Sequence, residues 1–353
     1  MTPLSPITNF VKHAVTGASL PPLNTTYYFD QPIDHNDLSL GTFKQRYWMD
    51  WEYYELGGPI LMFTPGENNA GGYSGYLTNI SIFGMIAQQE KGATLLIEHR
   101  FFGLSNPYPD LTSKSLKYLT VQHALDDFAH FAQNAKLPMP GGDSVTPDKA
   151  PWILLGGSYS GPGAQFYRFC DALEVDNGKI APAGGFGLEH AIAKWGAYFR
   201  NTYLQLLCGN QGAECNEFGG FQDGAPTDSL TIASRLIQPG YDERQCVMMF
   251  PEAFSTPPLP NVQKLNEAYD GWNVQAGRIF FANGKRDPWR DATVSADEHN
   301  IASTDSQPIV ISDGFHFSDL RAAAGDVDPT VANVQKQALS FMHQWMEEFR
   351  SSH

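Results

Sequence analysis

The sequence predicts an α/β protein whose central sheet is largely parallel. Two short apolar runs, residues 59–63 and 93–98, end at polar turn residues and are typical of strands buried on both faces. Apolar runs at 151–155, 278–282 and 308–311 predict three further strands. Because helical segments alternate with these runs, the pattern favours parallel strands joined by crossover helices.

Two segments carry clear helical periodicity. Thr120 is a favourable N-cap for the first, whose apolar face would consist of Ala124, Leu125, Phe128, Phe131 and Ala132. The second helix closes the chain, and its apolar residues are Val331, Val334, Ala338, Phe341, Met342, Trp345 and Phe349.

The segment 161–274 differs from the rest because it is Gly-rich, carries the cysteines and is only weakly periodic. We therefore expect a reduced, irregular cap region inserted into a single domain that spans residues 1–353. The core of that domain would comprise residues of about 25–160 and 275–353.

The charge balance argues against a nucleic-acid partner. The chain has 23 Lys and Arg against 38 Asp and Glu, a formal net charge of −15. Nucleic-acid binding requires clustered basic residues, so we expect no such partner. No segment has the roughly 18 uncharged apolar residues of a membrane span, and we expect none. The first residues show no basic segment followed by an apolar one, so no signal peptide is visible.

Other features favour a secreted or a lysosomal or vacuolar protein. Asn24 and Asn79 begin tripeptides with the form of N-glycosylation acceptors. The four cysteines, Cys170, Cys208, Cys215 and Cys246, allow three disulfide pairings, although four reduced core thiols are the alternative. Because no C-x-x-C pair or histidine cluster accompanies them, we expect no metal site and no cofactor.

A candidate catalytic triad follows three of the predicted strands. Ser158 lies in GGSYSG directly after 151–155, Asp287 follows 278–282, and His316 follows 308–311. A serine hydroxyl becomes nucleophilic when an imidazole removes its proton and a carboxylate orients that imidazole. In α/β-hydrolases these residues come in the chain order Ser, Asp, His, each after a strand. The order predicts Ser158, Asp287 and His316 as catalytic residues.

Each motif alone also has a structural interpretation. Ser160 replaces the second glycine of G-x-S-x-G, so the motif can be a simple turn, and an Asp before Pro is a common turn former. For the oxyanion hole we predict the backbone N–H of Tyr159 together with the turn that contains Gly66 and Glu67. The Glu67 side chain either meets a substrate amine or caps a neighbouring helix. The turn that contains Gly66 and Glu67 can also be a plain β-turn without a role in catalysis.

Several motifs together resemble one family, the lysosomal and secreted prolyl serine peptidases: FTPGE, GYLTN, LIEHRFFG, PWILLGGSYSG, CNEF, NGKRDPWRD and DGFHFSDL. The fungal acid prolyl endopeptidase branch looks closest, beside the Pro-Xaa carboxypeptidase and the dipeptidyl peptidase. The resemblance implies an α/β-hydrolase fold and cleavage on the carboxyl side of proline, best at acid pH, with proline-containing peptides or proteins as partners. It also implies an aromatic wall at Trp289 for the proline pocket.

The same resemblance implies a disulfide between Cys215 and Cys246, which leaves Cys170 and Cys208 as the other pair. The chain departs from the family after GGSYSG, where a strand beside the nucleophile strand and most of a helical cap are absent. A helix that began directly after Ser158 would hold Pro162 one turn in, at a cost of about 3 kcal/mol. A helix that began later, with Ser160 as N-cap, would tolerate Pro162.

The leading prediction is therefore a proline-specific serine peptidase of shortened form. Two alternatives remain at this point. One is a catalytically impaired or inactive hydrolase, and the other is a small-ester hydrolase that keeps the triad without the peptide subsites.

Overall fold

The computed structural model describes residues 3–4, 11–157, 175–176, 179–180, 215, 219, 235–236, 238–274 and 277–352. The chain divides into two compact units. The first comprises Met1–Pro109, Thr120–Gly163 and Gln263–His353, and the second comprises Asp110–Leu119 and Ala164–Val262. The expectation that core and cap form one domain over 1–353 stays a prediction.

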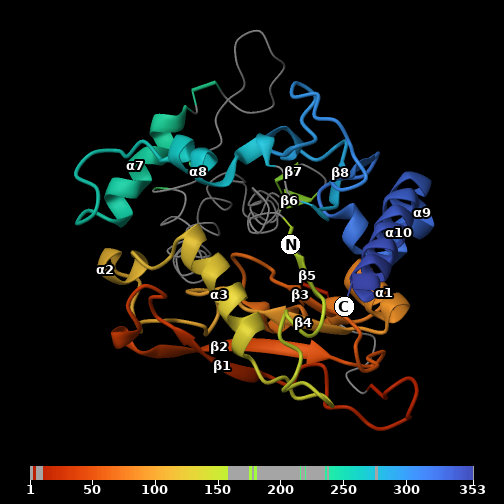
Figure 1. The fold of residues 1–353 in the computed structure, drawn as a ribbon. Helices are drawn as coiled ribbons and strands as arrows, with labels where there is room; N and C mark the ends of the chain where they lie inside the picture. Colours follow the sequence, from red (N-terminus) through yellow and green to blue (C-terminus); the bar gives the residue numbers. More distant parts are fainter. Residues whose placement is uncertain are drawn as a thin grey trace. The chain divides into compact units, whose positions relative to one another are not determined.

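The first unit contains a five-stranded sheet in the order β1-β2-β4-β3-β5 (Figure 1). Its strands are β1 (Tyr27–Pro32), β2 (Thr42–Asp50), β3 (Ile60–Phe63), β4 (Ala93–Ile97) and β5 (Trp152–Leu155). The β1–β2 and β2–β4 pairs are antiparallel, and β3 pairs in parallel with both β4 and β5. The predicted α/β class is confirmed, but this sheet is mixed and not largely parallel, because two of its four pairings are antiparallel.

A second, two-stranded parallel sheet consists of β8 (Phe281–Gly284) and β9 (Ile309–Ser312). No strand among the described residues pairs with the free edges of β5 and β8. The strand predicted at 278–282 begins three residues later, at Phe281, and its predicted first residue, Arg278, has a φ of 63°, which an extended strand excludes. All residues of β3 and β4 are buried, as predicted, whereas Leu154 of β5 is 53% exposed.

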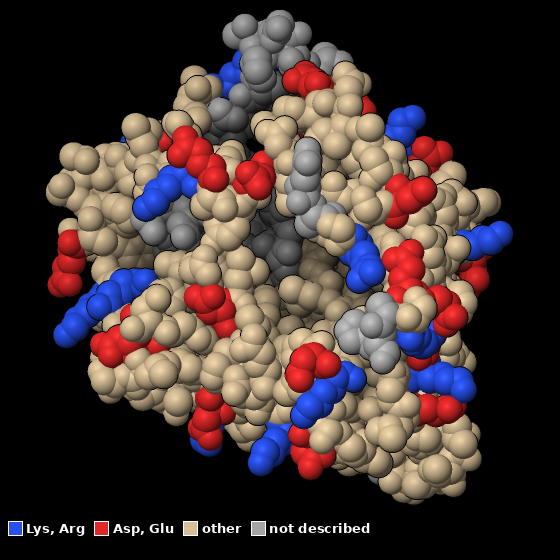
Figure 2. Space-filling model, viewed as in Figure 1, with Lys and Arg blue, Asp and Glu red and all other residues tan. Residues whose placement is uncertain are grey.

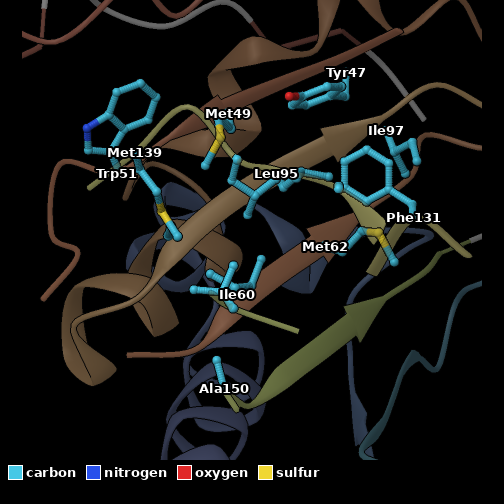
Figure 3. Close-up of a cluster of buried hydrophobic side chains, with 14 of the residues drawn as sticks. Tyr47, Met49, Trp51, Ile60, Met62, Leu95, Ile97, Phe131, Met139 and Ala150 are labelled. Carbon is cyan, nitrogen blue, oxygen red and sulfur yellow. The ribbon is translucent and has the colours of Figure 1, made fainter. Parts of the chain in front are cut away.

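Apolar layers cover both faces of the five-stranded sheet. On one face α3 (Val121–Asn134) packs Phe128 and Phe131 onto side chains of β2, β3 and β4 (Figure 3). On the other face lie α1 (Ile82–Glu90) and α10 (Pro329–Ser352), where Met342 and Trp345 join the core. Alternate residues of one strand serve the two faces: Leu61 lies in one cluster and Met62 in the other. This core fixes the ends of β3, β4 and β5.

The predicted helices are confirmed. The Thr120 side chain accepts a hydrogen bond from His123 N at 3.2 Å and caps α3, although Leu125 on its expected apolar face is 40% exposed.

The remaining elements are α2 (Ser113–Leu116), β6 (Val175–Asp176), β7 (Lys179–Ile180), α7 (Pro239–Met249), α8 (Val262–Tyr269), α9 (Ala322–Val327) and the 3-10 helices η1 (Leu38–Leu40), η2 (Ala70–Gly72), η3 (Ser74–Leu77), η7 (Gly271–Asn273), η8 (Arg290–Ala292) and η9 (Ser318–Leu320). Sequence analysis missed α7 and α8, which lie within the segment expected to be irregular.

Surface charges are mixed. On the face shown in Figure 2, Lys and Arg side chains alternate with Asp and Glu among the described residues. Within the described part of the chain, no helix has the length and apolar character needed to cross a bilayer. No cluster of three or more His, Cys, Asp or Glu side chains suited to a metal ion occurs among those residues either.

Candidate active site

Asp287 and His316 meet at the ends of β8 and β9. His316 Nδ1 donates to Asp287 Oδ2 at 2.6 Å, and the side chains are 10% and 6% exposed respectively. A carboxylate only accepts, so Nδ1 carries the proton and Nε2 of the neutral ring is left as the acceptor. Nε2 is buried and has no hydrogen-bond partner among the described residues. The pair is therefore arranged so that Nε2 can take a proton from a third group.

The backbone fixes the two loops against each other. Lys285 N donates to Ser312 O at 2.7 Å, and Arg286 N donates to Gly314 O at 3.0 Å. Gly284 lies so close to the second loop that a Cβ there would come within 2.5 Å of Gly314 O. Asp287 itself is held by Trp289 N, which donates to Oδ1 at 2.9 Å. The sequence NGKRDPW thus brings its carboxylate to a fixed place beside the histidine loop.

Phe317 connects this site with the end of β5. Its φ of 64° turns the chain sharply after His316, and its ring centroid lies 4.1 Å from that of His316. A Cβ at Gly157 would overlap the Phe317 ring, so only glycine permits this approach. Sequence analysis missed Phe317, because nothing in a single sequence marks a residue of positive φ after a histidine. Gly157 is the last described residue before Ser158. Ser158 and Tyr159 lie outside the described residues.

The turn after β3 holds the other predicted oxyanion residues. Gly66 has a φ of 68°, and its N–H donates to Thr64 Oγ1 at 3.3 Å, while Asn68 N donates to Gly66 O at 2.8 Å. Glu67 is 8% exposed. The role of Gly66 and Glu67 in binding an oxyanion stays a prediction, as does any contact of Glu67 with substrate.

The remaining predicted residues are distributed elsewhere. Trp289 is half-buried two residues after Asp287, and Asn24 and Asn79 are both exposed, as a glycan acceptor requires. Cys215 and Cys246 form a disulfide, which is the pair that the resemblance implies. Cys170 and Cys208 lie outside the described residues.

A carboxyl group that sequence analysis missed lies close to the pair. Asp319, in η9, is half-buried, and burial raises its pKa to about 6, while the nearby His316 lowers that pKa and Asp287 raises it. Its backbone carbonyl accepts from Gln335 Nε2 at 3.0 Å, which ties η9 to α10. The candidate site thus contains two carboxyl groups and one imidazole.

Comparison with known proteins identifies the family. The model of the serine carboxypeptidase S28 family matches residues 31–173 and 213–338, which is more than half of the chain. The chain belongs to this family. It is accordingly a serine peptidase, and the predicted enzyme class is confirmed.

Relatives of this S28 protein include fungal and animal proteins. It is 25% identical to the serine protease vicPa of Bipolaris victoriae, covering 91% of this chain and 88% of the relative. It is 32% identical to the human lysosomal Pro-X carboxypeptidase over 42% of this chain and 30% of the relative. It is also similar to a probable extracellular serine carboxypeptidase of Arthroderma benhamiae, at 37% identity over 39% of this chain and 20% of the relative.

The alignment with vicPa shows that the relative is longer in places. It extends over 472 positions although this chain has 353 residues, so vicPa carries segments that this chain lacks. Among solved structures, the carboxylesterase EstE1 from a metagenomic library aligns with 89% of this chain and 90% of its own, at 13% identity and a TM-score of 0.38.

Proposed function

We propose that this S28 protein hydrolyses peptide bonds on the carboxyl side of proline through an acyl-enzyme on Ser158. His316 Nε2 would remove the proton of the Ser158 hydroxyl as its Oγ attacks the scissile carbonyl, and would then donate that proton to the leaving amine. A water molecule, deprotonated by the same nitrogen, would release the acyl group. Asp287 would hold the ring in the tautomer that leaves Nε2 as acceptor.

The observation that supports this proposal most strongly is the unpartnered, buried Nε2 of His316. Burying an imidazole nitrogen without a partner is unfavourable, and such exceptions concentrate at functional sites. The loop that carries it packs through Phe317 on Gly157, one residue before the proposed nucleophile. The oxyanion of the tetrahedral intermediate would be bound by the backbone of Tyr159 and of the Gly66–Glu67 turn.

The proposed substrate class is supported by the name of one relative and by the position of Trp289. A relative is named Pro-X carboxypeptidase, and Trp289 is held beside Asp287 by its own backbone N–H. A flat indole face suits the pyrrolidine ring of proline. The names of two relatives, one lysosomal and one extracellular, also lead us to propose that this protein acts in one of those compartments.

Paired anilide substrates test the proline preference. We expect a blocked Gly-Pro anilide to be hydrolysed and the matched Gly-Ala anilide to be hydrolysed at least about tenfold more slowly, since a missing pocket contact costs roughly 1–3 kcal/mol. Trp289→Ala should reduce kcat/KM for the prolyl substrate alone, and Trp289→Phe should restore part of it. Hydrolysis of a p-nitrophenyl ester without any hydrolysis of the prolyl anilide would instead identify a small-ester hydrolase.

A further inference from the structure

A buried ion pair between Arg46 and Glu98 lies outside the proposed triad. Arg46 is on β2, and Glu98 directly follows β4 and is fully buried. Arg46 donates from Nε to Oε2 at 2.9 Å and from Nη2 to Oε1 at 2.6 Å. A buried carboxylate is unfavourable unless hydrogen bonds compensate its desolvation. The groups that donate these bonds therefore show which backbone segments the ion pair holds in place.

One side of the carboxylate is enclosed by its own following loop. Leu104 N and Ser105 N donate to Oε2 at 3.0 Å each, and Ser105 Oγ donates to the same oxygen at 2.7 Å. Gly103, with a φ of 57°, approaches so closely that a Cβ would overlap Glu98 Oε1. This loop fixes Glu98 itself.

The other side reaches the turn after β3. Ala70 N donates to Glu98 Oε1 at 3.0 Å, and Arg46 Nη2 donates to Asn69 Oδ1 at 3.0 Å. Asn69 Oδ1 also accepts from Gly71 N at 3.0 Å and so caps η2. Both members of the ion pair therefore bind the residues that directly follow Gly66, Glu67 and Asn68.

We propose that the Arg46–Glu98 pair positions the backbone turn 64–68 for oxyanion binding, an inference that rests on the function proposed above. The turn is short. The sheet holds its first end through Phe63, and the ion pair holds its second end at Asn69 and Ala70. Fixing both ends removes the freedom that would displace the turn's N–H groups, and a displacement of about 1 Å can cost on the order of a hundredfold in rate. Arg46 and Glu98 are thus positioning residues.

Variants at both members of the contact test the proposal. Asn69→Ala removes the acceptor of Arg46, and Asn69→Asp keeps it. Glu98→Gln replaces one carboxylate oxygen by a donor that faces other donors. Asp127→Asn is the matched control, because Asp127, which lies on α3, is an equally buried partner of Arg100, and among the described residues Arg100 donates to Ile33 O after β1 and not to the turn after β3.

Two measurements are made on each variant. Hydrogen exchange followed by mass spectrometry should show faster exchange in peptides covering 64–72 for Asn69→Ala and Glu98→Gln, but not for Asn69→Asp or Asp127→Asn. For a p-nitrophenyl ester, kcat should fall about 10- to 100-fold in Asn69→Ala with little change in KM, and Asn69→Asp should recover most of it.

Unchanged exchange in peptides 64–72, or an equal fall of kcat in Asp127→Asn, would overturn the positioning role. A wild-type protein that hydrolyses nothing would overturn both the proposed function and the catalytic part of this inference. In that case the exchange data would still show whether the ion pair holds the turn.

Discussion

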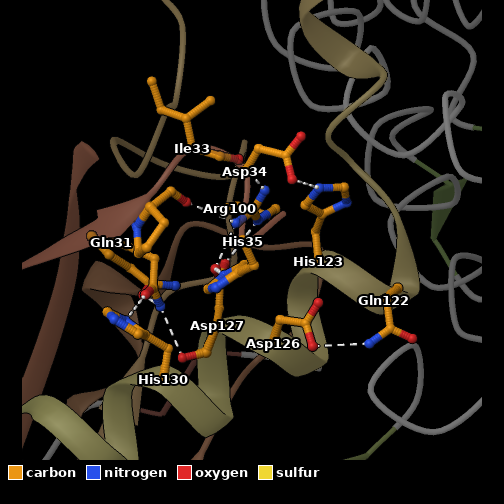
Figure 4. A network of polar contacts seen from close by, with 12 residues as sticks. Gln31, Ile33, Asp34, His35, Arg100, Gln122, His123, Asp126, Asp127 and His130 are labelled. Carbon is orange, nitrogen blue, oxygen red and sulfur yellow. Dashed lines mark hydrogen bonds and ion pairs between the residues drawn. The ribbon is translucent and has the colours of Figure 1, made fainter. Parts of the chain in front are cut away.

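Two of the carboxylate–histidine pairs in the first unit, Asp287–His316 and Asp127–His35, lie in different surroundings. Asp287 accepts from His316 Nδ1 at 2.6 Å, and Asp127 accepts from His35 Nε2 at 2.8 Å. Asp127 also accepts two bonds from Arg100, and its backbone carbonyl accepts from Gln31 (Figure 4). His316 instead keeps a buried nitrogen without a partner among the described residues. The imidazole of the first pair therefore keeps an unused acceptor, whereas the carboxylate of the second pair accepts three hydrogen bonds, one from His35 and two from Arg100.

This difference separates a site that can move a proton from one that holds elements together. The Asp127 network joins α3 to β1 and to the residues after β4, since Arg100 also donates to Ile33 O at 3.1 Å. Removing a partner from such a network leaves a buried charge uncompensated. We therefore expect variants of the two pairs to affect different measurements.

The largest effect should come from the histidines. His316→Ala removes the proposed general base, so kcat for a p-nitrophenyl ester should fall by about 10⁴-fold or more while the melting temperature changes little. His35→Ala is the matched control, and it should keep kcat. Equal activity in both variants, with both folded, would contradict the distinction.

Variants of the two aspartates should also differ, one in activity and the other in stability, with smaller effects than the histidine variants. Asp287→Asn should lower kcat by up to about 10⁴-fold because the amide favours the wrong tautomer of His316. Asp127→Asn should lower the free energy of unfolding by about 3 kcal/mol or more because Arg100 loses its counter-charge. Urea denaturation and ester kinetics on both variants check this, and a reversed pattern would exchange the two roles.

A third buried carboxyl group, that of Asp50, sharpens the comparison, because it forms no ion pair among the described residues. Burial, with a smaller contribution from Glu52, raises the pKa of Asp50 to about 7. The folded protein therefore favours the protonated form of Asp50. The contribution of this group to the free energy of unfolding is fully present below pH 4 and is lost as the pH rises through about 7.

The free energy of unfolding should accordingly fall between pH 4 and pH 7, and this group contributes at most roughly 4 kcal/mol to that fall. The melting temperature should fall over the same pH range. Asp50→Asn should flatten that dependence and raise the melting temperature at pH 8. A dependence that is identical in wild type and Asp50→Asn would show that Asp50 does not titrate in this range.

The smallest effect concerns the cap of the helix that carries Asp127. Thr120→Ala removes the acceptor for His123 N, so the free energy of unfolding should fall by about 1 kcal/mol. Thr120→Ser keeps the hydroxyl and should retain most of that stability. Kinetic parameters should not change in either variant, because α3 lies outside the proposed active site.

Much of this fold could be predicted from the sequence, because β3 and β4 are continuous apolar runs and α3 has a cap and an apolar face. The strands β1 and β2 could not be recognised in the same way, because both mix polar and apolar residues instead of forming a continuous apolar run. At the site, the positions of Asp287 and His316 after strands predicted that the two side chains meet, and their catalytic roles stay a prediction. The Arg46–Glu98 and Arg100–Asp127 pairs could not be predicted, because no motif marks their members as partners across 52 and 27 positions of the chain.

The central claim is that Ser158 is a nucleophile served by His316 and Asp287. Labelling with a fluorophosphonate probe tests it most directly, because the probe reacts only with an activated serine. We predict that the wild-type protein labels, that Ser158→Ala does not, and that His316→Ala labels far more slowly while both remain folded by circular dichroism. A folded wild-type protein that fails to label, or equal labelling of Ser158→Ala, would contradict the claim.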